Sequence, residues 1–199
     1  MAVGVAAVVY VRWFRPWQLT WGATVEEVAR RLPGDELVSR PTFDATRAIT
    51  IAAPAEQVWP WLVQVGVTRA GWYSYDFLDN FMRPSADRII PELQHLAPGD
   101  IMGMSPDGKQ GIAVHSLDPP HSMVWATLPD TTWAWQLDEN EDGSTRLATR
   151  VRSRYRWLSP SIAFSMLLEF ADIWMMCKML LNLRDRAEDE HRSDRNGDP

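Results

Sequence analysis

Two pairs of acidic residues have a spacing that acid–base chemistry could use. Asp76 and Asp79 are three residues apart, as are Glu169 and Asp172, so each pair would lie on one face of a helix. A carboxyl group inside an apolar cavity has a raised pKa and can transfer a proton at neutral pH. Tyr73 is close in sequence and its hydroxyl could polarise a carbonyl, so the candidate catalytic residues are Asp76, Glu169 and Tyr73.

The same acids also have structural explanations, which we favour over catalysis. Asp76 is a suitable N-cap for a short helix over residues 77–82, and Asp79 would stabilise the positive end of that helix. Glu169 and Asp172 fall on a narrow polar stripe of a long C-terminal helix, where they would face water. The sequence therefore leaves an enzymatic function uncertain and leans against it.

The sequence lacks the residue sets that are typical of a metal site or an activated nucleophile. Of the four histidines, His115 and His121 lie on either side of a predicted Pro-Pro turn, His191 falls in the C-terminal tail, and the fourth is His95. This number and spacing of ligands does not suit one metal ion. Ser105 occurs in a turn sequence, GMSPDG, and not in a G-x-S-x-G motif. We therefore predict no metal and no cofactor.

Large apolar side chains are the unusual feature of the composition. The chain contains 11 tryptophans and 9 methionines; tryptophan lines pockets as readily as cores, and methionine adapts to varied apolar shapes. Tyr73 and Tyr75, like Trp133 and Trp135, are two residues apart and would point the same way in extended chain. Such side chains could line a cavity, with a packed core as the alternative. The candidate ligand-binding residues are Trp72, Tyr73, Tyr75, Met102, Trp125, Trp133, Trp135, Met166, Phe170 and Trp174.

Length and charge limit the class of protein. The 199 residues suit one domain with tails, and 46% of them are hydrophobic, an ordinary value for a globular protein. The net charge of −6 argues against a nucleic-acid partner, which requires a basic face. Cys177 is the single cysteine, so no internal disulfide can form, and this fits a reducing compartment. The oligomeric state is left open.

The N-terminus indicates contact with a membrane. Residues 1–11 form an unbroken apolar run, which as a helix spans about 16 Å and is therefore half as long as a bilayer core is thick. Arg12 and Arg15 follow together with Trp13 and Trp17, as at the cytoplasmic border of a membrane segment. We interpret residues 1–17 as a short or truncated membrane anchor, with a frayed leader as the alternative. The folded domain would then be cytoplasmic or lie at the inner face of the cell membrane.

The rest of the chain predicts a run of strands between two helical regions. Residues 18–45 indicate a linker with a short helix that begins with a capping box of Thr24 and Glu27. A strand from residue 46 precedes a helix over 54–66, in which Pro60 should cause a kink. The expected antiparallel strands lie near 100–104, 111–117 and 122–128, and in a hairpin that turns at Asp142 and Gly143. The chain then forms one long helix from about residue 160 and a disordered tail over 189–199.

Strands in one run with helices at both ends predict an α+β fold with an antiparallel sheet. The segment ATRAITIAAPAEQVWPWLVQVG resembles the opening of the SRPBCC superfamily, which includes START-like and birch-pollen-allergen-like proteins. The polyketide cyclase/dehydrase-like branch is the most similar, and the resemblance covers residues 46–188. It implies a helix-grip fold, in which a curved antiparallel sheet is wrapped on a long C-terminal helix.

The resemblance implies a ligand-binding domain but brings no catalytic residues with it, because one fold hosts many functions. We expect the chain to bind or transport a hydrophobic small molecule or lipid in an internal cavity, at the cytoplasmic face of a membrane. The first alternative is a polyketide cyclase/aromatase-like enzyme that uses a cavity carboxylate and a tyrosine. The second is a non-catalytic assembly or regulatory module.

Overall fold

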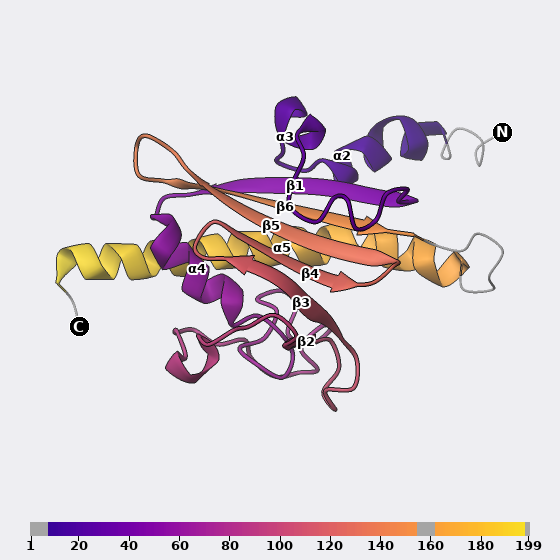
Figure 1. Cartoon of the computed structure of the whole chain (residues 1–199). Helices are drawn as coiled ribbons and strands as arrows, with labels where there is room; N and C mark the ends of the chain where they lie inside the picture. The colour runs from indigo at the N-terminus through magenta and orange to yellow at the C-terminus, as the bar shows by residue number, and fades with distance from the viewer. Residues whose placement is uncertain (1–7, 155–161, 198–199) are drawn as a thin grey trace.

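The computed structural model describes residues 8–154 and 162–197; the side chains of Val11 and of residues 162–171 lie outside this description. One antiparallel sheet of six strands, in the order β1-β6-β5-β4-β3-β2, packs one face against the long helix α5, Ile162–Asn196. Figure 1 shows α5 running behind the twisted sheet. The predicted α+β architecture, a curved antiparallel sheet on a long C-terminal helix, is confirmed.

The strands form where the sequence alternates between apolar and polar residues. In β5 and β6 the odd-numbered side chains of Trp133, Trp135, Leu147 and Thr149 point toward α5, because Trp135 is paired with Thr149 across the two strands. The predicted hairpin between these strands turns at residues 141–143. The six strands are β1 Phe43–Ile51, β2 Ile101–Gly103, β3 Gly111–Asp118, β4 Ser122–Thr127, β5 Thr131–Glu139 and β6 Thr145–Ser153.

Short helices surround the sheet. Helix α4, Ala55–Val63, follows Pro54 and keeps its helical form across Pro60, and it buries Val58 and Leu62 in the core. The other helices are η1 Tyr10–Phe14, α2 Arg15–Leu19, α3 Val25–Ala29 and η2 Pro91–Leu93. The predicted capping box of α3 is present, since Thr24 and Glu27 exchange side-chain-to-backbone hydrogen bonds.

The segment predicted as a linker, residues 18–45, is instead packed against the sheet. Its part after α3 lies on the face opposite α5 (Figure 1), where Leu32 is buried against Val124 and Ala134. In the part before α3, the carbonyl of Trp21 accepts a hydrogen bond from the amide of Ala48 on the free edge of β1. These contacts join residues far apart in the sequence, so local composition did not reveal them.

The C-terminal end also differs from the prediction. Residues 189–199 were expected to be disordered, but α5 continues to Asn196. Two bonds to α4 explain the difference: the Trp61 indole donates to Glu190 over 2.6 Å, and the Gln57 amide donates to Asp194 over 2.9 Å. Tertiary contacts of this kind stabilise helical turns whose own sequence has no apolar face.

Arg150 on β6 joins the outer segment to the sheet. Its guanidinium is buried, donates to the Thr46 hydroxyl and pairs with the Asp35 carboxylate at 2.6 Å. It also donates to three backbone carbonyls around α3, those of Glu27, Val28 and Arg30. One side chain therefore satisfies several of the polar groups that this layer places against the sheet.

We expect Arg150→Met to lower the free energy of unfolding by about 3 kcal/mol, because three backbone carbonyls would lose a buried charged donor and Asp35 would keep only its longer ion pair with Arg152. Urea unfolding measures the change. Arg192→Met is the control, because Arg192 is exposed and pairs with Asp189 on the helix surface, and it should alter stability by less than about 0.5 kcal/mol. Equal effects of the two variants would contradict the role of Arg150.

Candidate ligand-binding site

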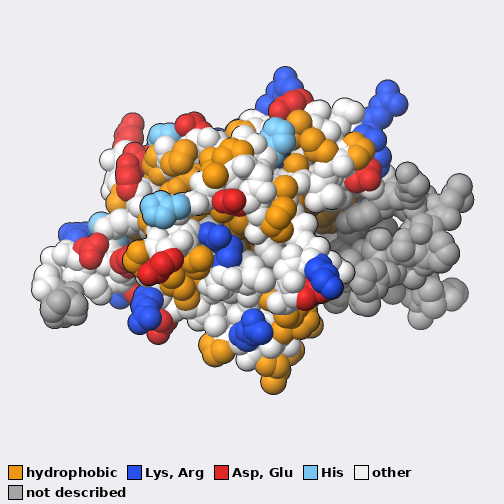
Figure 2. All heavy atoms as spheres, turned by 60° about the horizontal axis from the view of Figure 1, so that its bottom comes forward, with side chains coloured by type: hydrophobic (Ala, Val, Ile, Leu, Met, Phe, Trp, Pro, Cys, Tyr) orange, Lys and Arg blue, Asp and Glu red, His pale blue; other side chains and the backbone are white. Residues whose placement is uncertain are grey.

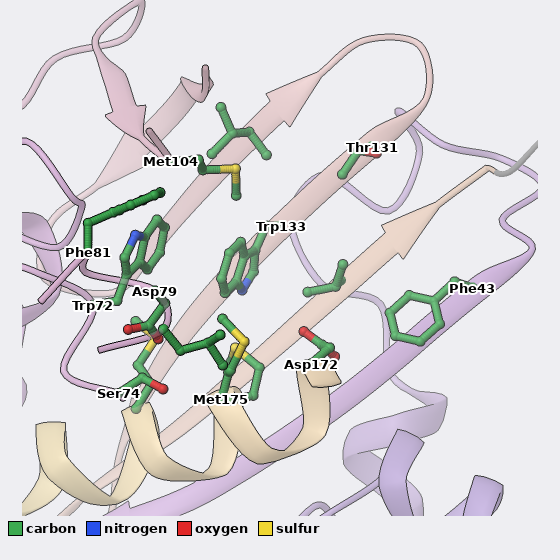
Figure 3. Close-up of a pocket in the computed structure, with 15 residues that line it drawn as sticks. Phe43, Trp72, Ser74, Asp79, Phe81, Met104, Thr131, Trp133, Asp172 and Met175 are labelled. Carbon is green, nitrogen blue, oxygen red and sulfur yellow. The ribbon is translucent and has the colours of Figure 1, made fainter. Parts of the chain in front are cut away.

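A cavity of about 440 Å³ lies between the sheet and the first described turns of α5. Figure 3 shows its wall: strands on one side, α5 on another, and the segment that carries Trp72 and Asp79 at one end. Most of the lining side chains are apolar. The lining residues are Phe43, Trp72, Ser74, Leu78, Asp79, Phe81, Met104, Ile112, Thr131, Trp133, Val151, Asp172, Met175, Met176 and Met179.

Two stacked indoles, Trp133 of β5 and Trp72 of the loop segment, border the cavity. The rings of Trp72 and Trp133 are nearly parallel, with centroids 5.8 Å apart. The Trp133 indole N–H donates to the Thr149 hydroxyl over 2.8 Å, and Thr149 in turn donates to the Ala134 carbonyl. Because this chain of bonds fixes the ring, the sheet presents a flat and rigid aromatic surface.

The helix side of the cavity is soft and has one charged group. Met175, Met176 and Met179 line it with flexible thioethers, which adapt to apolar ligands of varied shape. Asp172 lies on the same helix, just before Met175, and also lines the cavity. Its Oδ2 pairs with Nη1 of Arg47 in β1 at a distance of 2.7 Å. Burial raises the pKa of the Asp172 carboxyl, and the Arg47 guanidinium partly offsets that effect.

Arg47 is the link between the cavity wall and the N-terminal helix. It is almost completely buried, and its Nε donates to the backbone carbonyl of Gln18 in α2 over 2.9 Å. The Asp172 carboxylate therefore has a strong cationic partner behind the wall and is compensated by the protein itself.

The segment after Gly71 forms a series of turns, and the short helix predicted over 77–82 is absent from it. Phe81 and Met82 have φ values of 51° and 66°, which a right-handed helix does not allow. Asp76 accepts hydrogen bonds from the amide and the hydroxyl of Ser85 instead of capping a helix. Gly71 is required here, since its φ is +88° and an added Cβ would lie 2.5 Å from the Ser85 hydroxyl oxygen.

These turns place Asp79 at the end of the cavity. Both of its carboxylate oxygens are buried, and neither makes a hydrogen bond with the described part of the chain. Burial raises the pKa of the Asp79 carboxyl, and the neighbouring Ser74 hydroxyl and local backbone amides only partly oppose this shift. A buried carboxylate without a partner costs stability. Among the described lining residues, Asp79 is the charged side chain that no cation pairs with.

The comparisons with known proteins concern the fold. No protein-family model and no curated protein match the chain. The chain is similar to the solved structure of a polyketide-cyclase-like protein from Corynebacterium glutamicum, at 17% identity and a TM-score of 0.49, over 74% of this chain and 92% of that one. For a protein from Nitrosomonas europaea the values are 16%, 0.45, 75% and 96%, and for the Aha1 dimer from Colwellia psychrerythraea they are 18%, 0.37, 73% and 96%.

The architecture decides the fold: an antiparallel meander of β2 to β6, extended by β1 beside β6, packs against one long C-terminal helix, with a cavity between them. The chain has a helix-grip fold. The strand and helix that carry the opening motif are β1 and α4.

The helix-grip cavity includes some of the predicted ligand-binding residues and omits others. Trp72 and Trp133 line it. Buried elsewhere in the core are Tyr73, Met102, Trp125 and Trp135. Tyr75 packs against Phe77, and Trp174 is half-exposed on α5. The side chains of Met166, Phe170 and the candidate acid Glu169 lie outside the described residues.

The remaining catalytic candidates do not meet in the cavity. The Tyr73 hydroxyl accepts from the Gln64 amide over 2.7 Å, and the Arg186 guanidinium lies 4.8 Å from the ring centroid. Burial raises the pKa of Tyr73 to about 12, although both of these neighbours oppose the shift. Asp76 is occupied by Ser85. The tyrosine and the acid therefore have structural partners of their own.

The lining residues that the prediction missed carry a partial signal in the sequence. Asp79 and Asp172 line the cavity and are the second members of the two acid pairs, so the spacing pointed to the neighbourhood of both carboxylates. Phe43, Leu78 and Phe81 come from a strand end and from turns, where no periodicity marks an inward side.

Metal-ligating clusters and membrane-spanning helices would point to other functions. Among residues 8–154 and 162–197, no group of three or more histidine, cysteine, aspartate or glutamate side chains is placed to hold a metal ion. In the same part of the chain, none of the helices combines the length and the apolar character that crossing a membrane requires.

We expect Asp79→Asn to make the protein more stable at pH 7. The folded-state pKa of Asp79 lies above its unfolded value of about 3.9, so ionisation destabilises the wild type once the pH rises above that value. Urea midpoints should therefore differ at pH 7 and coincide below about pH 4. The exposed Asp87→Asn should show no such difference; a variant of Asp79 that is less stable at pH 7 would contradict the prediction.

Proposed function

We propose that this protein binds or transports a hydrophobic small molecule or lipid in the cavity between the sheet and α5. The observation that carries the proposal is the cavity wall itself, in which eleven of the fifteen described lining residues are apolar. Its volume of about 440 Å³ is in the range of small-molecule sites, about 300–1,000 Å³. Each CH₂ group that leaves water for such a cavity contributes about 0.8 kcal/mol.

An opening for the ligand is supported by the side chains at one end of the cavity. Leu78, Phe81 and Met104 line the cavity and are also about half-exposed to solvent. Phe77 and Met82, on the same turns, are more exposed still. On the face shown in Figure 2, hydrophobic side chains likewise reach the surface among charged ones of both signs. An apolar rim of this kind suits a ligand that enters from an apolar donor.

A cavity-filling substitution tests the proposal. Val151 lines the cavity from β6, so Val151→Trp should fill the space and weaken binding of the neutral fluorophore N-phenyl-1-naphthylamine at least tenfold, or about 1.4 kcal/mol. The matched control is Val25→Trp, because Val25 is exposed on α3 and the same side chain there leaves the cavity open.

Fluorescence titration of both variants and the wild type gives the dissociation constants, and far-ultraviolet circular dichroism checks that each variant is folded. A wild type that does not bind the fluorophore would argue for a filled, non-binding module. Equal binding by the wild type and a folded Val151→Trp variant would place the ligand outside this cavity.

We further propose that the N-terminal helix holds the protein at the cytoplasmic face of a membrane. Residues 8–19 are helical, and the exposed Val9, Trp13 and Trp17 are four residues apart, so they lie on one side of the helix. Arg12 and Arg15 accompany them. Indoles at headgroup depth beside arginines are typical of a cytoplasmic membrane border, and an apolar ligand could then reach the cavity with little exposure to water.

Vesicle binding tests this part of the proposal. Trp13→Ser and Trp17→Ser should each weaken co-sedimentation with vesicles of phosphatidylcholine and phosphatidylserine by about tenfold, because each removes an apolar group that would be buried. Trp174→Ser is a matched control: Trp174 is 48% exposed on α5, compared with 44% for Trp17. The same loss in all three variants, or in none, would show that this helix face is not the contact.

A further inference from the structure

We propose that the cavity selects apolar ligands whose polar end donates a hydrogen bond, as an amine or an alcohol does, and that Asp79 accepts that bond. This inference rests on the proposed function, because it assigns the chemistry of one end of the ligand that the cavity would hold. It excludes fatty acids and other ligands that have an anionic end.

The charges along the cavity wall support this choice. Among the described lining residues, the ionisable side chains are Asp79 and Asp172, and lysine, arginine and histidine do not occur. The Asp172 carboxylate is paired with Arg47 at 2.7 Å. Asp79 is therefore the acid of this wall that is free to receive a ligand group.

The surroundings of Asp79 leave a place for one donor. In Figure 3 the carboxylate lies beside Trp72 and near Ser74, at the loop end of the cavity. Its two oxygens and the Ser74 hydroxyl are buried and make no hydrogen bond within the described part of the chain. Buried polar groups in folded proteins nearly always have hydrogen-bond partners, so a donor group of a ligand at this point would supply the partner that Asp79 lacks. The apolar body of the ligand would then lie over Trp72, Trp133 and the methionines.

The same arrangement discriminates between ligand head groups. A hydrogen bond to a charged acceptor corresponds to about tenfold to hundredfold in affinity. A ligand carboxylate at the same point would bring two like charges together where little water screens them, and one of them would have to take up a proton. Two ligands with equal chains and opposite end charges should therefore bind with very different affinities.

Competition between matched ligands tests the proposal. Decylamine, 1-decanol and decanoate share one chain length, and each can displace N-phenyl-1-naphthylamine from the wild-type protein at pH 7. We expect decylamine to bind at least tenfold more tightly than decanoate, with 1-decanol also tighter than decanoate. Decylamine and decanoate are both charged in water, so their ratio of dissociation constants reports the site more directly than either constant alone.

Substitution of the acceptor gives the second arm. In Asp79→Asn the decanoate-to-decylamine ratio should fall at least tenfold, because an amide can donate to a carboxylate and no longer attracts the ammonium group. The fluorophore carries an N–H group of its own, so its dissociation constant is measured separately for each variant and used to convert the displacement data. Asp87→Asn is the matched control, because it removes one negative charge from an exposed position of the same loop between α4 and η2. In this variant the ratio should keep its wild-type value.

The outcomes separate the two proposals. If the fluorophore and all three decyl compounds fail to bind, the proposed function is wrong and the head-group preference falls with it. If they bind but the wild-type ratio is near one, or the ratio is the same in a folded Asp79→Asn variant, then the cavity binds apolar ligands without Asp79 and this inference alone is overturned. Should the variant not fold, the wild-type ratio decides.

Discussion

The central constraint in this molecule is that one uninterrupted helix of 35 residues has to pack against a twisted sheet. Such a helix can follow the sheet over only part of its length. Its later turns are in close contact, with Leu180, Leu183 and Ala187 fully buried and α4 packed beside them. Its earlier described turns, from Asp172 to Met179, leave the cavity between themselves and the strands. The site is thus a consequence of the fold and needs no separate scaffold.

The two faces of the sheet differ in how completely their charged groups are paired. On the outer face Arg146, Arg150 and Arg152 reach the carboxylates and carbonyls of residues 22–35, so the charges there are paired. On the inner face Asp172 is paired, but Asp79 is buried without a partner. An unpaired carboxylate in a cavity wall costs stability, and costs of this kind concentrate at functional sites.

The fold could be read from the sequence because alternation and turn residues are local signals. The inward faces of β5 and β6 and the turn at Gly143 follow from spacing alone. The outer segment and the last turns of α5 could not be read in this way, since Arg150 and Trp61 hold them from distant positions. The positive φ angles at Phe81 and Met82 could not be predicted either, because phenylalanine and methionine rarely adopt such a conformation.

The site was only partly predictable for a related reason. Trp125, Trp133 and Trp135 share the inward face, and the sequence treats them alike. Trp133 borders the cavity, whereas Trp125 and Trp135 are enclosed by core side chains. The difference depends on which part of α5 lies opposite each ring. Distance from α5 is a property of the assembled layers, and no periodicity within a strand encodes it.

Arg47 gives the molecule a mechanical property that neither layer has by itself. One guanidinium is bonded both to the backbone of α2 and to the Asp172 carboxylate in the cavity wall. A displacement of α2 relative to β1 must therefore either break one of these bonds or move the arginine with it. The pairing of the Asp172 carboxylate therefore depends on where α2 lies, because the same guanidinium holds both.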